Sequence, residues 1–504
     1  MTEVKQSRRF SIYTAFCCFI AVYMSVREVL PLNFLIESAA VSGAIFVCAF
    51  VLIIIDLFTE QQCLKGRISD LLIFFIAFCA ISSVVNIKYG FFGNLKVLGA
   101  LAIEFLFFYP FAKGKNEQEI KHSLNILSAV LIITWCVFTL LSLSMFFFSV
   151  DYLVRGVGSW GIVNQGFSSS YDRLWGIFQD PNYASTICAI SVFLSARLIA
   201  QKKGVVTSIL LVLNIIIQMS YIALGGSRAC IIILSVGTVL VVLWKTVFAS
   251  KISAKKLCCG ILISALSVAA VFGSLKLLKK VLPVVRTGIV TQQAETAVNN
   301  AFDKFYSVSG LEFFHSDDTD ISKPSDPDFT PDGNHNITRT DLENMNDISN
   351  GRFKRWKETI KIFLKSPIFG ASPRNISEFA KEHCPDTLMA MYGIASHNGY
   401  LDVLVSTGII GFIILAAAVL LGVIKILAVY FAPGSSTELC WLTAQLAMLA
   451  LSAFFVSDVF MSFSMGAFLF WLYFGMAQSF SPKNDTESLF GSIFNKIFRR
   501  KEKE

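Results

Sequence analysis

The 504-residue sequence contains few charged side chains. Only 15% of its residues are Asp, Glu, Lys or Arg, whereas hydrophobic residues make up 55%. A soluble domain carries roughly 25% charged residues and hides its apolar side chains in one core. This chain has too little charge to cover so much apolar surface. The composition therefore excludes a soluble enzyme, a secreted disulfide-bonded domain and a nucleic-acid-binding protein, and it indicates a membrane protein.

Histidine is also scarce, with five residues in the chain. No His, Cys or Glu residues have the spacing of a zinc site, so we expect no catalytic metal and no other cofactor. Most of the 12 cysteines lie inside apolar runs, where a thiol behaves as a small hydrophobic group, and no structural disulfide is expected. Residues 332–343 have the acidic ends of a calcium loop, but Ile337 stands where that turn needs glycine.

Apolar runs of about 20 residues recur along the chain, which is the length a helix needs to cross a bilayer core of roughly 30 Å. They predict an all-α polytopic membrane protein. We place twelve spans at residues 11–27, 38–58, 69–87, 95–112, 123–148, 181–200, 205–224, 229–248, 257–275, 400–422, 438–456 and 459–480. The first run has no small-residue cleavage site after it, so we interpret it as a retained helix.

Lysine and arginine gather in the short connections on one side of this arrangement, and the positive-inside rule makes that side cytoplasmic. Both termini are then cytoplasmic. The net charge of +8 is thus explained by orientation and implies no nucleic-acid partner. We divide the chain into four parts: an N-terminal bundle of about nine spans (1–275), an extracytoplasmic loop (276–397), about three C-terminal spans (398–480) and a basic cytoplasmic tail (481–504).

The extracytoplasmic loop has two halves of opposite charge. The insert 301–350 contains eleven acidic and three basic residues with several prolines, which predicts a flexible loop. In the following stretch basic residues dominate. Apolar side chains recur there at helical spacing from Phe353 to Leu364, between lysines and arginines. We therefore predict a basic amphipathic helix over 351–365 that lies on the outer membrane surface.

Three arginines are candidates for binding a phosphate group. Arg228 lies in a tight Gly-Gly-Ser-Arg turn between two apolar runs, and Arg352 and Arg355 share one face of the amphipathic helix. The planar guanidinium is always charged and binds phosphate through two donors. The alternative is that Arg228 extends to the lipid headgroups and that Arg352 and Arg355 form a solvated basic face.

His397 is the candidate for proton transfer. It lies where the chain re-enters the membrane after the extracytoplasmic loop. An imidazole titrates near neutral pH and could take a proton from a sugar hydroxyl. A hydrogen-bonded structural histidine at the membrane boundary is the alternative.

Four stretches in this order resemble the bacterial O-antigen ligase and polymerase superfamily, the Wzy/WaaL family, over about residues 170–415. They are Arg173 to Asn182 (RLWGIFQDPN), Gly226 to Ala229 (GSRA), Asn350 to Trp356 continuing to Ser366–Gly370 (SPIFG), and Ser396 to Tyr400 (SHNGY) with Thr407–Gly411 (TGIIG). The acidic insert 301–350 is not part of that pattern. Within the superfamily the chain is most similar to a Wzy-type polysaccharide polymerase.

The resemblance implies a metal-independent membrane glycosyltransferase of the GT-C type in the bacterial cytoplasmic (inner) membrane, with its active site on the extracytoplasmic side. The donor would be an undecaprenyl-diphosphate-linked oligosaccharide. Membrane lipid, a flippase and a chain-length regulator would be further partners. The roles that it implies are catalytic for His397, Arg228 and Arg352 and substrate-binding for Arg355, Arg173, Asn398, Asp180 and Asn182.

Three functions remain open from the sequence. We favour a polymerase that joins lipid-linked repeat units into an O-antigen, capsule or exopolysaccharide. A ligase that transfers the finished glycan to a lipid or protein would use the same residues. A transporter that flips the lipid-linked glycan is disfavoured because the predicted spans hold few ionisable residues, such as Glu104 and Arg197.

Overall fold

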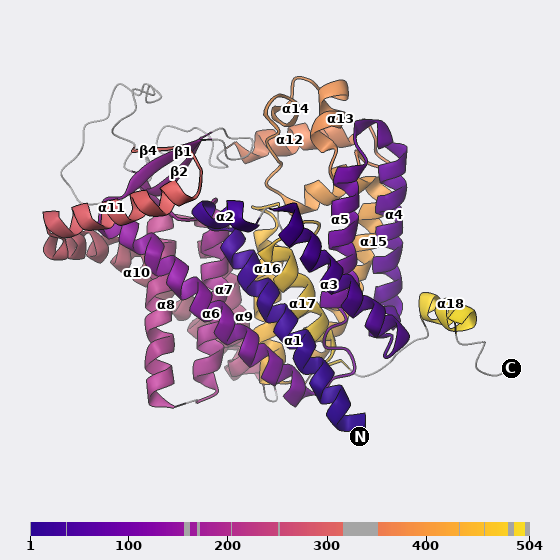
Figure 1. Ribbon diagram of the computed structural model, residues 1–504. Coiled ribbons are helices and arrows are strands. Elements are labelled where there is room, and N and C mark those ends of the chain that lie inside the picture. Colours follow the sequence, from indigo (N-terminus) through magenta and orange to yellow (C-terminus); the bar gives the residue numbers. More distant parts are fainter. Residues whose placement is uncertain are drawn as a thin grey trace.

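The computed structural model describes residues 2–36, 38–155, 162–168, 172–202, 204–249, 252–315, 351–432, 434–457, 459–481 and 488–498. The described chain is mostly helical (Figure 1). Nine of its helices are long and apolar enough to cross a membrane: α1 (Thr2–Arg27), α3 (Ala39–Phe58), α4 (Arg67–Val85), α6 (Glu117–Phe147), α7 (Pro181–Ala200), α8 (Val205–Gly225), α9 (Arg228–Leu243) together with the π-helical turn Trp244–Phe248 that continues it, α10 (Ala254–Ile289) and α15 (Gly399–Tyr430). The chain is therefore an integral membrane protein.

The three other predicted spans coincide with shorter helices. They are α5 (Phe92–Ile103), which continues as a π-helical turn over Glu104–Phe108, α16 (Thr437–Ser452) and α17 (Met465–Gln478). Helices α16 and α17 lie in the middle of the bundle, and nearly all of the side chains of α17 are buried (Figure 1). The membrane-spanning role of these three helices stays a prediction.

Smaller helices complete the fold. They are α2 (Leu30–Ile36), α11 (Gln292–Val308), α12 (Arg352–Phe363), α13 (Ile376–His383), α14 (Leu388–Tyr392) and α18 (Leu489–Phe498), with helical turns at Gln62–Leu64, Ile87–Tyr89 and Trp244–Phe248. Helices α12, α13 and α14 gather at one end of the bundle, and the N-terminus lies at the opposite end (Figure 1).

The structure corrects the all-α prediction, because four short strands form an antiparallel sheet. The strands β1 (Asp151–Arg155), β2 (Ile162–Ser168), β3 (Arg173–Gly176) and β4 (Phe313–His315) lie in the order β3-β2-β1-β4. Tyr152 and Val154 of β1 are buried, and the ring of Tyr152 packs on Tyr306 of α11. Strands of three to seven residues carry too little alternation to be recognised beside long apolar helices.

The division of the chain into four parts stays a prediction, but the last helix of the N-terminal bundle is longer than predicted. Helix α10 continues to Ile289, well past residue 275. The first part of the insert 301–350 is also not a flexible loop, since α11 reaches Val308 and β4 follows it. The Tyr152 hydroxyl donates to the Asp303 carboxylate at 2.7 Å, which attaches α11 to the sheet. Residues 316–350, including the calcium-like stretch, lie outside the described residues.

A buried ion pair joins α7 to α16. The Arg197 guanidinium is fully buried, and its Nε lies 2.6 Å from Oε2 of Glu438. Asn125 and Gln201 complete the hydrogen bonds of this pair at 2.9 and 3.1 Å. Because a buried charge without its partner is costly, these contacts fix the position of α7 relative to α16.

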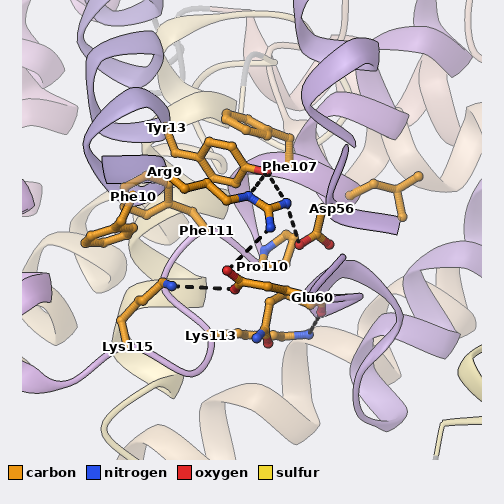
Figure 2. Close-up of a pocket in the computed structure, with 12 residues that line it drawn as sticks. Arg9, Phe10, Tyr13, Asp56, Glu60, Phe107, Pro110, Phe111, Lys113 and Lys115 are labelled. Carbon is orange, nitrogen blue, oxygen red and sulfur yellow. Dashed lines mark hydrogen bonds and ion pairs between the residues drawn. The ribbon is translucent and has the colours of Figure 1, made fainter. Parts of the chain in front are cut away.

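A second charged cluster links α1 to the end of α3 (Figure 2). The Arg9 guanidinium lies among the Tyr13 hydroxyl and the carboxylates of Asp56 and Glu60, and Lys115 also approaches Glu60 at 3.5 Å. The cavity among these side chains holds about 20 Å³, which is room for about one water molecule. This cluster lies at the N-terminal end of the bundle, and it is too small to bind a sugar.

The predicted basic tail contains the apolar helix α18, which is bound to α4. The Asp70 carboxylate accepts hydrogen bonds from the Ser488 hydroxyl and from the amides of Leu489 and Phe490, at 2.7, 2.9 and 3.2 Å. A side chain from another helix thus caps the N-terminus of α18. The ring of Phe490 packs on Phe74 with centroids 5.0 Å apart.

Candidate functional site

Arg173 fastens strand β3 to two helix ends. Its side chain is buried, its Nε donates to the carbonyl of Gly225 at 2.8 Å, and its Nη2 donates to Oδ1 of Asn182 at 2.8 Å. These bonds join the start of α7 to the end of α8. Arg173 and Asn182, both predicted to bind substrate, therefore bond to each other and fix the turn that precedes Arg228.

Asp180 begins helix α7. Its Oδ1 accepts from the amides of Asn182 and Tyr183 at 2.7 and 3.5 Å, and Pro181 occupies the first helical position. This is the usual chemistry of a helix N-terminus. The half-buried carboxylate is also close enough to His397 to influence its ionisation.

Arg228 is the first residue of α9. The chain reverses at Gly226, which has a φ of 60°, and the Ser227 hydroxyl accepts the amide of Cys230 at 3.4 Å as the helix cap. The Arg228 side chain is exposed. Because Arg173 holds the Gly225 carbonyl, the turn places the Arg228 backbone next to the segment that carries Asp180.

Helix α12 supplies Arg352 and Arg355. It packs against α15 at the end of the bundle away from the N-terminus (Figure 1). Both arginines are half-buried, the Arg352 guanidinium lies 5.5 Å from the ring centre of Phe455, and burial lowers the pKa of Arg355. Arginines three residues apart on one helix face can together bind one diphosphate.

His397 lies in a short hydrogen-bonded segment, residues 396–399, at the start of α15; this segment is called the hook. His397 has a φ of 52°, which is uncommon for a residue other than glycine. Oδ1 of Asn398 caps the helix by accepting the amides of Tyr400 and Leu401 at 3.0 and 3.1 Å, and the amide of Gly399 donates to the carbonyl of Ala453 at 2.7 Å. The hook therefore holds the histidine backbone rigidly, and Asn398 has a structural bond as well as its predicted role.

Three charged side chains from other segments influence the pKa of His397. The pKa of His397 is lowered to about 4, mainly by burial; the Asp180 carboxylate opposes this shift, and the positive charges of Arg355 and Arg352 add to it. The imidazole is therefore neutral at neutral pH and able to accept a proton. The structure thus brings together His397, Asp180, Arg352 and Arg355 from three separate stretches of the chain.

Sequence reasoning missed two residues that support the hook. The Ser396 hydroxyl accepts the amide of Asn398 at 2.9 Å and donates to the Asp402 carboxylate at 2.6 Å. The acidic residue in the first turn after a helix-capping asparagine was a readable signal for Asp402. Among the described residues no three His, Cys, Asp or Glu side chains form a group that could hold a metal.

Comparison with known proteins identifies one family. Residues 207–416 match the family model described as O-antigen ligase, whose members are glycosyltransferase-like enzymes acting on lipid-linked glycans in membranes. The matched segment contains Arg228, α12 and His397. It begins at residue 207, so Arg173 and Asp180 lie outside it. No curated protein matches the chain. The resemblance seen in the sequence is confirmed over residues 207–416, where the chain matches the O-antigen ligase family model and so supports the O-antigen ligase and polymerase superfamily.

Proposed function

We propose that this protein is a polymerase that joins undecaprenyl-diphosphate-linked oligosaccharide repeat units into a surface polysaccharide. The observation that supports the proposal is the charge arrangement around His397, where a neutral imidazole lies among two arginines and one carboxylate. By the predicted orientation, this cluster faces the extracytoplasmic side of the inner membrane. Arg228 lies on the neighbouring turn.

The proposed reaction needs charge stabilisation at one place and proton removal at another. The acceptor hydroxyl oxygen forms a bond with the anomeric carbon of the donor, and the bond from that carbon to the phosphate oxygen breaks. Arg228, Arg352 and Arg355 stabilise the diphosphate that leaves with the carrier lipid. His397 takes the hydroxyl proton, and the nearby Asp180 carboxylate stabilises the imidazolium that results.

The low pKa of His397 predicts the acid side of the pH profile. A base must be neutral to act, so the rate should stay constant from about pH 8 down to about pH 5.5 and fall only near pH 4. The measurement is the transfer rate of the purified protein in lipid nanodiscs with a synthetic lipid-linked repeat unit. A midpoint near the ordinary histidine value of 6.5 would contradict the proposed environment of His397.

The ligase is the second candidate, because the matching family model carries the description O-antigen ligase. A ligase would transfer the finished glycan to a lipid or protein acceptor with the same residues. The two functions share the site geometry and differ in their product. A polymerase makes a longer lipid-linked glycan, whereas a ligase attaches the finished glycan to a lipid or protein acceptor.

His397→Ala in the native host tests both functions, with the extracted surface and lipid-linked glycans separated on a gel. Loss of long chains with single repeat units remaining is the result expected for a polymerase. Long chains that are made but stay on the lipid carrier would indicate a ligase instead. An unchanged ladder from a well-expressed variant would remove His397 from the chemistry and favour a transporter.

His383→Ala is the matched control. His383 lies at the end of α13, and its ring contacts Tyr89 and Phe379. It is not among the charged groups that influence His397. We therefore expect His383→Ala to give the wild-type ladder.

A further inference from the structure

Helix α15 is broken at Gly408, and another part of the chain fills the break. Gly408 has a φ of 65° and a ψ of −172°. In a continuous helix the amide of Ile409 would bond to the carbonyl of Val405. Here the amide of Ile409 donates to the carbonyl of Pro367 at 2.8 Å, and the carbonyl of Val405 accepts the amide of Ala371 at 2.8 Å. Residues 366–371, called the wedge below, thus satisfy both groups of the missing hydrogen bond.

Two glycines make this fit possible. A Cβ atom on Gly408 would lie 2.2 Å from the carbonyl oxygen of Ile368, and one on Gly370 would lie 2.5 Å from both the amide nitrogen of Gly408 and the carbonyl oxygen of Ser406. Both glycines also have a positive φ, of 65° and 70°. No other residue fits without moving the wedge or α15.

The outer end of α4 holds the wedge in place. The Ser82 hydroxyl lies 2.6 Å from the carbonyl of Phe369 and 3.3 Å from that of Ser406, so it touches both the wedge and α15. The Asn86 amide group donates to the carbonyl of Gly370 at 3.0 Å. The wedge is therefore fixed from two sides.

The wedge connects the two helices that carry the charge cluster. Helix α12, with Arg352 and Arg355, ends at Phe363 shortly before the wedge begins. Helix α15 begins two residues after His397 and reaches the break at Gly408. We propose that Gly370 and Gly408 are positioning residues, which keep the arginines of α12 near His397 by locking the wedge into the break of α15.

The consequence for catalysis rests on the proposed function. If a side chain displaces the wedge, α12 moves with it, and the arginines leave the diphosphate and the imidazole. The charged groups that influence His397 are Arg352 and Arg355 from α12 and Asp180 from the start of α7. Loss of the two positive charges and of burial would raise the pKa of His397 toward its ordinary value, while Asp180 would act in the same direction.

The experiment compares Gly370→Ala and Gly408→Ala with the full-length wild type in nanodiscs. Diethyl pyrocarbonate reacts with an imidazole only in its neutral form. The pH dependence of His397 modification, read at this residue by mass spectrometry, therefore reports its protonation without any need for activity. We expect the midpoint to rise by about one pH unit and the transfer rate to fall at least about tenfold. Folded variants with an unchanged midpoint would overturn the proposal.

Gly66→Ala and Gly434→Ala are the controls. These glycines also have a positive φ, of 82° and 79°, but a Cβ atom there meets no atom of the described chain within 4 Å. The two alanine variants therefore introduce the same backbone strain at a positive φ but no clash between the new Cβ atom and a neighbouring atom. We expect them to leave the midpoint of His397 modification unchanged. A shift of equal size in the controls would overturn the proposal.

Ser82→Ala keeps the test decisive if the glycine variants do not fold. It removes the hydroxyl between Phe369 and Ser406 and adds no atom. We expect a smaller rise of the midpoint in the same direction, and an unchanged midpoint in folded Ser82→Ala would overturn the proposal. If the wild type shows no polymerisation but the midpoint still moves, the proposed function fails and the role of the wedge stands.

Discussion

Arg228→Lys is expected to lower the rate of glycan transfer by at least about a hundredfold, the effect of losing one well-placed donor to a developing negative charge. Arg228 is exposed at the first position of α9, on the turn that Arg173 holds. Lysine keeps the positive charge but replaces the planar, two-donor group with a single ammonium. The transfer assay with the synthetic lipid-linked repeat unit measures the change.

Arg374→Lys is the control for this substitution. Arg374 is an exposed arginine between α12 and α13, and it is not among the charged groups near His397. Its replacement should leave the rate within about twofold of wild type, because exposed charges far from a site contribute little. Full activity of Arg228→Lys would mean that Arg228 serves only as a contact to lipid headgroups.

Arg197→Ala is expected to destabilise the protein by about 3–5 kcal/mol, which is the typical effect of leaving one member of a buried ion pair without its partner. Among the described residues, the variant leaves the buried Glu438 carboxylate with Lys121 as its remaining ion-pair partner, whose nitrogen lies 3.7 Å away. The thermal unfolding temperature in detergent, measured by size-exclusion chromatography, reports the loss. Little folded protein should remain at temperatures where the wild type is stable.

Two further variants test whether the loss of stability comes from the unpaired buried charge or from the loss of a side chain. Lys121→Ala should cost less than about 1 kcal/mol, because the Lys121 side chain is 46% exposed. Arg197→Met combined with Glu438→Gln should recover much of the stability, since no unpaired charge remains buried. Equal losses for Arg197→Ala and Lys121→Ala would contradict the assignment of the stability to the buried pair.

Much of the membrane architecture was readable from the sequence. The predicted spans 181–200 and 205–224 differ by at most one residue from α7 and α8. Apolar runs of this length are a local property, and a bilayer imposes one length on every helix that crosses it. Helix α10 continues to Ile289, past the predicted end of its span at residue 275, so the length rule did not give the end of this helix.

The small sheet and the contact between the wedge and α15 could not be predicted from the sequence. Strand β4 has three residues, and its partner β1 lies far away in the chain, so its pairing depends on contacts that no local pattern encodes. The motifs Ser366–Gly370 and Thr407–Gly411 were visible as stretches that resemble a family. That they lock together through Gly370 and Gly408 follows only from the close approach of two backbones.

The sequence by itself determined that the chain is a membrane protein, where most of its helices lie and which superfamily it resembles, because hydrophobic length and short motifs are local. Only the tertiary structure decided which of the candidate residues meet. Asp180, Arg352, Arg355 and His397 come from distant stretches and are brought together by helix packing. The lowered pKa of His397 is likewise a tertiary property, since it arises from burial and from charges on other segments of the chain.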